Sequence, residues 1–239
     1  MPRFFSDEIS DNTIIISGGD AVHIGRSLRM KPGDELIICS KGMEYRTSIR
    51  SISNSQVICD IISSSPSLAE PNIRLTLFQA IPKSDKLDFI VQKAVELGAT
   101  EVCPVLTNRC VSRPDKKSFE KKKSRLQKIA LEAAKQSGRG IIPTISDIIT
   151  LDQCIQRMTA MGHAFICYEK GGKDLKDTAP VPGSSVGVLI GSEGGFASEE
   201  AEKCIASGIT PIGLGPRILR CETAPLCAVS IIMSLTGNI

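Results

Sequence analysis

Near its C-terminus the chain reads Leu214-Gly-Pro-Arg-Ile-Leu-Arg-Cys-Glu-Thr-Ala224, a junction between a short apolar run and a C-terminal helix pattern. Glycine and proline bend its first half, and then Ile218 and Leu219 lie between Arg217 and Arg220. A surface turn rarely places two large aliphatic side chains between two arginines. The pattern predicts an apolar cover on one side of this junction and an anionic partner on the other.

The residues before the junction alternate between strand and helix patterns. Apolar and β-branched runs predict strands at 73–80, 101–106, 164–168, 186–190 and 209–214, with a further short strand around Pro143. Apolar residues spaced three and four apart predict helices capped at Ser84, starting near Ser118, spanning 152–161, opening near Ser198 and spanning 224–235. Thr223 before Pro225 has the pattern of a helix N-cap. This alternation predicts an α/β domain over 71–239.

Residues 1–70 have a different pattern. Short β-branched runs at 14–17, 35–40, 44–52 and 56–62 are separated by turn residues, which predicts a small β-barrel. Arg26, Arg29 and Lys31 follow a short helix start and form a basic turn, or a solvated loop. The serines and prolines at 63–71 are typical of a linker.

Composition excludes several classes of protein. The nine cysteines are scattered, odd in number and never spaced C-x-x-C, so they predict a reducing cytosol and not a disulfide scaffold. The two histidines lie far apart, which predicts no metal site. The first residues lack the apolar core of a signal peptide, and no apolar run is long enough for a membrane span. A net charge of +3 permits a nucleic-acid partner without requiring one.

The most basic stretch lies between 116 and 128, where lysines and one arginine crowd a predicted helix. Such a run is either a solvated helix face or a surface that follows nucleic-acid phosphates. The absence of Trp and the presence of two Tyr argue against a platform for stacking single-stranded bases.

Ligands of open α/β sheets bind beyond the carboxyl ends of the strands. Three such ends are Tyr168-Glu169, Gly191-Ser-Glu-Gly-Gly-Phe196 and the 214–224 junction. The glycine-rich loop matches neither a P-loop nor a dinucleotide fingerprint, and Glu193 in its middle would repel a pyrophosphate. S-adenosylmethionine (SAM), which carries a sulfonium and no phosphate, suits this loop better, although the glycines could also serve only a tight turn. Cys221 is better explained by small-residue packing than as a nucleophile, because no histidine lies near it in sequence.

These two loops carry a resemblance to a known family. Gly191–Phe196 followed by Leu214–Ala224 resembles the bacterial 16S ribosomal RNA (uracil-N3) methyltransferases of the SPOUT superfamily. Weaker matches are Lys93-Ala-Val-Glu-Leu-Gly98, Glu132-Ala-Ala-Lys-Gln-Ser137 with Arg139 and Pro143, and Arg3-Phe4-Phe5. The resemblance spans essentially the whole chain.

The resemblance implies an N-terminal PUA-like β-barrel for RNA binding at 1–70 and a SPOUT α/β methyltransferase domain with a C-terminal deep trefoil knot at 71–239. It implies SAM as the cofactor, S-adenosylhomocysteine as the product, and a uridine N3 of 16S rRNA in the small ribosomal subunit as the substrate. It also implies a cytoplasmic homodimer whose knot helices pack across the interface, with no metal and no membrane partner.

The resemblance also implies roles for individual residues. The predicted catalytic residues are Arg220, Glu222 and Arg217, with Arg217 and Arg220 as candidates for stabilising the uracil anion and Glu222 and Glu193 as candidates for the base. The predicted cofactor-binding residues are Tyr168, Glu169, Ile190, Gly191, Ser192, Glu193, Gly194, Gly195, Leu214, Gly215, Ile218, Leu219, Arg220, Thr223 and Ala224. The predicted RNA-binding residues are Arg3, Arg26, Arg29, Lys83, Arg109 and Arg139.

Two residues depart from the family pattern. Ser192 lies where the family usually has Pro, and Cys221 lies where Thr is frequent. Both replacements are small, so we expect a preserved pocket. The histidine pair common near the basic turn is here Val22-His23, which weakens any role for that histidine.

Other functions remain open at this point. A related knotted enzyme could modify another RNA atom, such as a ribose 2′-hydroxyl. A non-catalytic RNA-binding assembly factor would keep the basic surfaces and lose the cofactor. A nicotinamide oxidoreductase is disfavoured because Glu193 lies in the loop and the fingerprint is missing.

Overall fold

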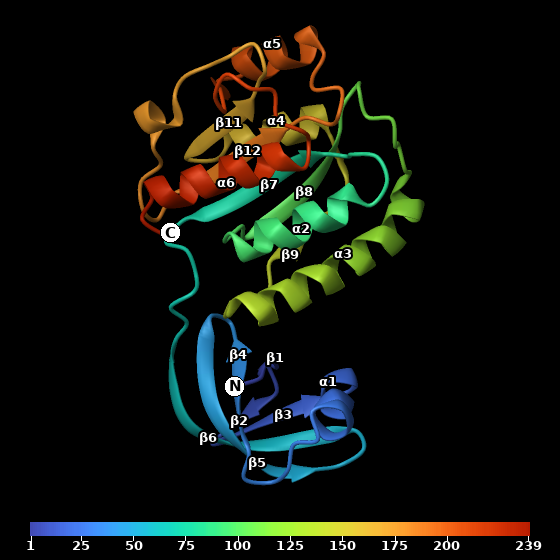
Figure 1. Cartoon of the computed structure of the whole chain (residues 1–239), viewed down its shortest axis with the longest axis vertical. Helices are drawn as coiled ribbons and strands as arrows, with labels where there is room; N and C mark the ends of the chain where they lie inside the picture. The colour runs from blue at the N-terminus through green and yellow to red at the C-terminus, as the bar shows by residue number, and fades with distance from the viewer. The chain divides into compact units, whose positions relative to one another are not determined.

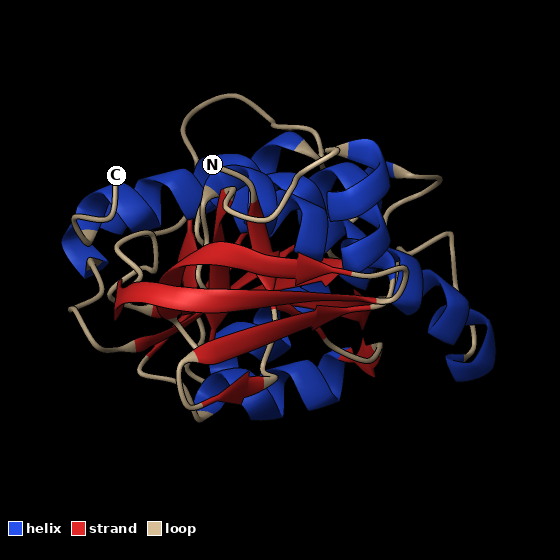
Figure 2. Ribbon diagram, turned by 90° about the horizontal axis from the view of Figure 1, so that it is seen from below, coloured by secondary structure: helices blue, strands red, loops and turns tan.

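The computed structural model describes residues 1–239 except for the side chain of Lys116. The chain divides into two compact units (Figure 1): Met1–Glu70 with Ala134–Ile142, and Pro71–Ala133 with Pro143–Ile239. The structure contains both helices and strands (Figure 2). Residues 1–70 are mainly strands, and residues 71–239 alternate between helices and strands, as the sequence predicted. Among the described residues, no helix combines the length and apolar character that crossing a membrane requires.

The first unit is built on a six-stranded sheet with the order β1-β4-β5-β6-β3-β2. Its β1 pairs parallel with β4, and all other neighbours are antiparallel. The strands are β1 (Arg3–Phe5), β2 (Ile9–Ser10), β3 (Thr13–Ser17), β4 (Glu35–Ser40), β5 (Met43–Ile52) and β6 (Gln56–Pro66). Two register shifts in the β5–β6 ladder mark bulges, which bend and twist a sheet.

The core of the first unit follows the period of two expected for half-buried strands. Ile14 and Ile16 of β3 are buried with Leu36 and Ile38 of β4. The short helix α1 (Gly19–Val22) and the π-helical turn η1 (His23–Ser27) contribute Ala21 and Ile24 to the same cluster. The basic turn is therefore anchored by apolar side chains on one side, while Arg26 and Arg29 are exposed on the other.

One prediction for this unit was wrong. The serine-rich segment that resembled a linker continues β6 as far as Pro66, because it pairs with Met43–Arg46 of β5. Residues 134–142, which include the last turn of α3 (Lys116–Ser137), also belong to this unit. They are held by Glu70, whose Oε1 accepts hydrogen bonds from the backbone N–H of Gly140 (2.8 Å) and Ile141 (3.1 Å).

The second unit is built on a parallel sheet with the order β10-β8-β7-β12-β11-β13, and β9 also pairs with β8. The strands are β7 (Arg74–Ala80), β8 (Glu101–Leu106), β9 (Thr144–Ile145), β10 (Ile149–Thr150), β11 (His163–Cys167), β12 (Ser185–Ile190) and β13 (Thr210–Ile212). Parallel sheets are covered on both faces, and β7 and β12 are accordingly buried almost throughout.

Helices cover this sheet as the strand patterns require. They are α2 (Lys86–Glu96), α4 (Leu151–Thr159), α5 (Ser198–Ala206) and α6 (Thr223–Leu235), with α3 and a 3₁₀ turn η2 (Leu175–Thr178). Figure 1 shows α2 and α6 side by side over the strands, and α6 contacts β7 and β12. Gly98 ends α2 with φ +102°, the left-handed conformation that favours glycine at this position.

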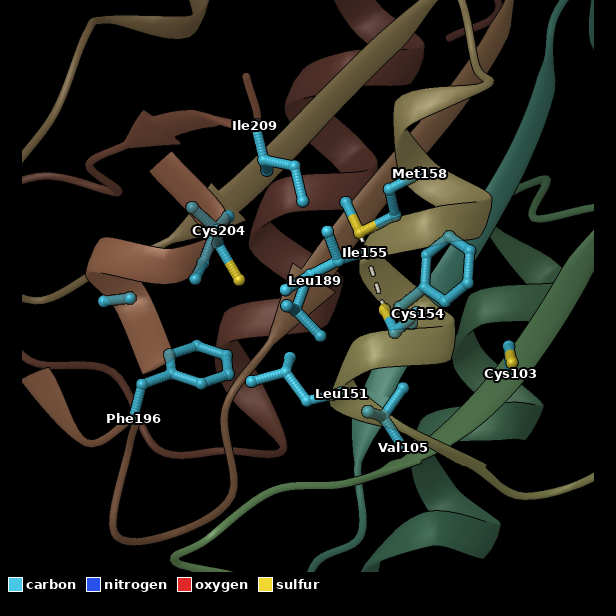
Figure 3. Packing of buried hydrophobic residues seen from close by; sticks show 13 residues of the cluster. Cys103, Val105, Leu151, Cys154, Ile155, Met158, Leu189, Phe196, Cys204 and Ile209 are labelled. Atoms are coloured by element: carbon cyan, nitrogen blue, oxygen red, sulfur yellow. Dashed lines mark hydrogen bonds between the residues drawn. The ribbon is translucent and has the colours of Figure 1, made fainter. Parts of the chain in front are cut away.

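A second set of buried side chains joins α4 and α5 to the sheet (Figure 3). Phe78 of β7 and Leu189 of β12 pack there with Met158 of α4 and Phe196 at the end of the glycine-rich loop. Cys154 belongs to the same cluster, with its Sγ 3.6 Å from the Sδ of Met158. Its thiol is an apolar core group, since burial raises its pKa. This packing fixes the carboxyl end of β12, from which the glycine-rich loop starts.

Two predicted helix caps were wrong. Asp85 is the N-cap residue of α2, because Ser84 adopts φ +55° and turns the chain before the helix begins. Glu222 is the N-cap residue of α6, and Thr223 is already helical. The reason is a tight turn in which the N–H groups of Thr223 and Ala224 both donate to the carbonyl of Arg220, at 2.8 and 2.9 Å.

Candidate functional site

A cavity of about 540 Å³ opens in the second unit at the carboxyl ends of β11, β12 and β13. Three loops form its wall: the segment after β11 with Tyr168 and Glu169, the glycine-rich loop Gly191–Phe196, and the loop Ile212–Ala224, called here the arginine loop. The expectation that these three strand ends meet is therefore confirmed. The volume is that of a small-molecule pocket.

The predicted cofactor residues lie in this wall with one exception. The cavity is lined by Tyr168, Glu169, Ile190, Gly191, Ser192, Glu193, Gly194, Gly195, Leu214, Gly215, Ile218, Leu219, Arg220 and Ala224. Thr223 is exposed and is not part of the lining.

The glycine-rich loop turns back on itself close to β12. Ser192 and Gly195 form an antiparallel bridge, and Gly195 has φ +65°. A Cβ on Gly191 would come within 3.0 Å of the Gly195 Cα, so both positions need glycine. Gln79, fully buried at the end of β7, donates from Nε2 to the Gly191 carbonyl at 3.3 Å. The result is a narrow loop whose backbone lines the cavity.

Residues after β8 hold the same loop from outside. The Nη1 of Arg109 donates to the Gly194 carbonyl at 2.7 Å, and Ser192 Oγ donates to the Arg109 carbonyl at 3.2 Å. Ser192 thus adds a hydrogen bond to the loop. Glu200 of α5 is buried and accepts from the N–H groups of Asn108 and Ala197.

The arginine loop presents charge and apolar surface together. Arg217 and Arg220 are exposed at the cavity, and neither has an ion-pair partner among the side chains that the structure describes. Ile218 is 88% exposed, whereas Leu219 is half-buried. The predicted apolar cover over Ile218 does not come from the described part of this chain.

A charged cluster links the glycine-rich loop to the arginine loop. Lys86, the first residue of α2, places its Nζ 3.2 Å from Glu193 Oε1 and 3.1 Å from Glu222 Oε2. The thiol of Cys221 donates to Glu222 at 3.2 Å, and the N–H of Lys83 donates to Glu193 at 3.0 Å. We call Lys86, Glu193, Cys221 and Glu222 the lysine cluster.

The cluster sets the protonation of its members. The hydrogen bonds from Cys221 and Lys86 lower the pKa of Glu222. Burial opposes ionisation of Glu193, but hydrogen bonds from backbone N–H groups and from Lys86 outweigh it and lower its pKa. Burial and the bond to Glu222 raise the pKa of Cys221 to about 12, so this cysteine is a neutral packing group and not a nucleophile.

The predicted RNA-binding residues divide into two groups. Arg26, Arg29, Lys83 and Arg109 are exposed. Arg139 is buried, and its guanidinium donates to both carboxylate oxygens of Glu70 at 2.9 and 2.8 Å. Arg3 is mostly buried against Glu44, at 2.9 Å. Each of these two arginines is paired with a carboxylate of the first unit, which indicates that both have a structural role.

The sequence interpretation missed Lys86 and Gln79. Lys86 had a detectable signal, because a lysine in the first turn of a helix opposes the helix dipole. A local rule broken without local compensation often marks a functional site. The only sequence signal for Gln79 was a polar residue, between Phe78 and Ala80, in a strand whose pattern is otherwise that of a buried strand.

The cavity fits an adenosyl ligand with a sulfonium. Its volume suits a small molecule, and Ile190, Leu214 and Leu219 give it apolar surface. The glycines leave room for a ligand against the backbone. Glu193 and Glu169 bring negative charge to the wall, which suits a cation better than a pyrophosphate. Among the described residues, no group of three or more histidine, cysteine or acidic side chains is placed to hold a metal ion.

Comparison with known proteins places both units in families. Residues 69–233 match the RNA methyltransferase domain family, and residues 16–62 match the RNA methyltransferase PUA domain family. The first unit is therefore PUA-like, and the second is a methyltransferase domain with a parallel sheet. The ribosomal RNA small subunit methyltransferase E of Bacillus subtilis is 38% identical over 228 residues, covering 92% of this chain and 89% of that protein.

Solved structures agree. The ribosomal RNA small subunit methyltransferase E of Neisseria gonorrhoeae, crystallised with SAM bound, is 29% identical with a TM-score of 0.88, covering 99% of this chain and 98% of that one. A Legionella pneumophila protein described as a methyltransferase, also with SAM bound, is 31% identical with a TM-score of 0.87, covering 98% and 97%. This chain belongs to the RNA methyltransferase family that includes the ribosomal RNA small subunit methyltransferases E, and its cofactor is SAM.

Proposed function

We propose that this chain methylates N3 of one uridine of 16S rRNA in the small ribosomal subunit. The observation that carries the proposal is the pair of exposed, unpaired arginines, Arg217 and Arg220, at the rim of a cavity that fits the cofactor. Uracil N3 becomes nucleophilic when it loses its proton, and the resulting anion needs a cation beside it. The names of the relatives support small-subunit rRNA as the substrate. The two arginines provide the cation that the uracil anion needs.

The cofactor, when bound, supplies a methyl group on a sulfonium and leaves as S-adenosylhomocysteine. In the proposed site, Tyr168, the glycine-rich loop and the apolar side chains of the arginine loop orient the adenosyl part. Alignment of two reactants can account for about 7–11 kcal/mol of a barrier. The arginine loop holds the base so that N3 points at the methyl carbon.

Arg220, with Arg217, stabilises the negative charge that develops on the uracil ring as N3 gives its proton to solvent water. Guanidinium groups that are already in place act without reorganisation at the moment of reaction. Glu222 is a weak base because its pKa is lowered, and it is held by Lys86 and Cys221. Its proposed part is therefore to fix the turn that carries Arg220.

Each unit offers exposed basic residues for RNA. We assign this role to Arg26 and Arg29 of the first unit and to Lys83 and Arg109 of the second, and we withdraw it from Arg3 and Arg139. Residues 1–70, which make up most of the first unit, serve as an RNA-binding PUA-like barrel in this proposal, and residues 71–239 form the methyltransferase domain apart from the segment 134–142, which packs with the first unit. The bulged six-stranded sheet supports closure into a barrel.

The deep trefoil knot belongs to the same proposal. The chain passes from β13 at one edge of the sheet to α6, which contacts β7 and β12 in its middle. On the way, residues 171–173 and 211–213 pass close together: Lys173 bridges to Ile212, and a Cβ on Gly172 would lie 2.3 Å from the Pro211 carbonyl. A crystal structure that traces residues 160–239 tests the knot. A chain in which the arginine loop does not thread through the loop after β11 would contradict it.

A homodimer is the third part of the proposal. Leu226, Cys227, Ile231 and Leu235 of α6 are only partly buried, and Ile218 is exposed. An apolar face of this kind is typical of a subunit interface. We expect light scattering to give twice the chain mass for the wild type and the chain mass for Ile231→Glu. A monomeric wild type would refute this part.

The test of the activity uses purified protein, SAM with a labelled methyl group, and small subunits that lack the modification. Mapping the label should find it on N3 of one uridine of 16S rRNA. Label on a ribose 2′-hydroxyl would assign a different knotted methyltransferase activity. If no label is transferred and calorimetry shows no binding of S-adenosylhomocysteine, the protein is a non-catalytic RNA-binding factor.

A further inference from the structure

The lysine cluster joins segments that are distant in sequence. Glu193 belongs to the glycine-rich loop after β12, Glu222 precedes α6, and Lys86 begins α2. The single ammonium group lies 3.2 Å from one carboxylate and 3.1 Å from the other. All three side chains are partly buried, with 24–32% of their surface exposed. Such pairs are screened less than fully exposed ones.

The position of the cluster relates it to the cavity. Lys86, Glu193 and Cys221 all line the cavity wall. Glu222 lies in the turn whose next two N–H groups donate to the carbonyl of Arg220. A displacement of Glu222 therefore moves the backbone that carries Arg220, without any direct contact between Lys86 and that arginine.

The charges in the cluster do not cancel. One lysine faces two carboxylates, which leaves a net negative charge at the cavity wall. Lys86 also lies in the first turn of α2, where the helix dipole disfavours a cation. Its location is thus explained by Glu193 and Glu222 and not by the helix it begins.

We propose that Lys86 is a positioning residue that holds the glycine-rich loop and the arginine loop together around the cofactor. The proposal rests on the proposed function, since it assigns the cavity to SAM and Arg220 to the reaction. Without Lys86 the carboxylates of Glu193 and Glu222 face each other as like charges and drive the two loops apart. The cofactor then loses one wall of its pocket, and Arg220 loses its alignment.

The test compares wild type, Lys86→Met, Lys86→Arg and a matched control, Lys93→Met. Lys93 belongs to the same helix and pairs with Glu96, away from the cavity. At pH 8, calorimetry should show S-adenosylhomocysteine binding weakened roughly 10- to 100-fold in Lys86→Met, the range of a like-charge contact. Lys86→Arg should regain most of the affinity, and Lys93→Met should match wild type.

A pH series separates this role from simple packing. In Lys86→Met, one carboxyl of the Glu193–Glu222 pair should take up a proton as the pH falls toward about 5.5, because like charges raise one pKa of a pair. Binding should then recover, while wild-type affinity stays level. Cys221 stays neutral over this range because its pKa is raised to about 12. Arg217, Arg220 and Glu169, which also line the wall, are the same in both proteins, so they do not produce a difference between them.

A second variant guards against misfolding. Lys86→Met combined with Glu193→Gln removes the like-charge contact, so it should bind S-adenosylhomocysteine at pH 8 more tightly than Lys86→Met alone. The loss that remains relative to wild type measures the part that Glu193 itself has in the cavity wall. Methylation by Lys86→Met at saturating SAM should remain below wild type, since Arg220 is displaced even when cofactor is bound. Wild-type affinity of Lys86→Met at pH 8, or an equal loss at pH 8 and 5.5, would overturn the proposal. If wild type itself binds no S-adenosylhomocysteine, the proposed function fails instead.

Discussion

Arg139 of the first unit and Arg220 of the second carry the same guanidinium group in opposite surroundings. Arg139 is buried and gives two hydrogen bonds to Glu70, so its charge is matched within the fold. Arg220 is exposed at the cavity and has no ion-pair partner among the described side chains. A buried pair stabilises or specifies a structure, whereas an unmatched cation at a pocket is available to a ligand. The residue type alone therefore does not show whether an arginine has a structural role or a role in binding a ligand.

The largest expected effect is on Arg220. Arg220→Ala should lower methylation of small subunits by at least about 10²–10³-fold, the usual loss when one stabilising donor is removed from an active site. Binding of S-adenosylhomocysteine, measured by calorimetry, should persist. The exposed Arg50, paired with Asp60 in the first unit, serves as the control, and Arg50→Ala should methylate normally. Wild-type turnover in Arg220→Ala would remove this residue from the mechanism.

Arg139 should show the reverse behaviour. Arg139→Met leaves the carboxylate of Glu70 without its partner, which should lower the free energy of unfolding by about 3–5 kcal/mol. Urea unfolding followed by circular dichroism measures this. Arg46→Met, which breaks an exposed pair with Glu35, should leave stability almost unchanged. If the two variants unfold at the same urea concentration, the contrast between buried and exposed arginines fails.

An acid titration tests the mostly buried ion pair of Arg3 and Glu44 in the first unit. Burial opposes ionisation of Glu44, but hydrogen bonds from Arg3 and Ser67 outweigh it and lower its pKa below the ordinary value of 4.5. The stability that Glu44 contributes is therefore present above about pH 4.5 and is lost as the pH falls through the lower folded value. Glu44→Gln should be less stable than wild type at pH 7, and the two melting temperatures should converge near pH 3. Curves that stay parallel would contradict the assignment.

The smallest effect concerns the basic side of α3. Several of its cations are paired: Lys123 with Asp147, and Arg125 with Asp85 and Asp88. Lys117, Lys121 and Lys128 have no ion-pair partner among the described side chains, and they offer charge to RNA phosphates. Changing all three to Gln should lessen the dependence of RNA affinity on salt, by roughly 0.7–0.9 in logarithmic slope for each phosphate that is no longer neutralised.

The control for this lysine set is Lys203→Gln, which removes a cation that is paired with Asp152 on another helix. Its salt dependence should equal that of wild type. If the triple variant also keeps the wild-type slope, the lysines of α3 form a solvated helix face, which is the other interpretation that the sequence allowed.

Much of the second unit was predictable from local patterns. β12 is a continuous apolar run because both of its faces are buried, and the loop after it follows from the rule on strand ends. The first unit was less predictable from local patterns. Ser63 to Pro66 have the composition of a linker, but they form a strand because backbone groups, which any residue supplies, pair with β5. Local composition predicts an element best where side chains, and not only the backbone, make its contacts.

The parts of the site that depend on long-range contacts were not predictable. Lys86 and Glu222 form an ion pair although more than a hundred residues separate them in the sequence, and no local spacing pattern indicates such a pair. Arg139 resembled a surface arginine because its partner, Glu70, lies far earlier in the chain. The predicted caps at Ser84 and Thr223 failed for a related reason, since each turn is closed by a backbone bond or conformation that the residue type does not reveal.

The membership of 134–142 in the first unit has a consequence for the order in which the protein folds as it is made. Residues 1–70 leave the ribosome first, but Glu70 must wait for Arg139 and Gly140 before its hydrogen bonds form. By then β7, α2, β8 and most of α3 have also been synthesised. The first unit therefore cannot complete its contacts before residues 71–133 of the second unit have been made, although chains usually fold N-terminal domains first.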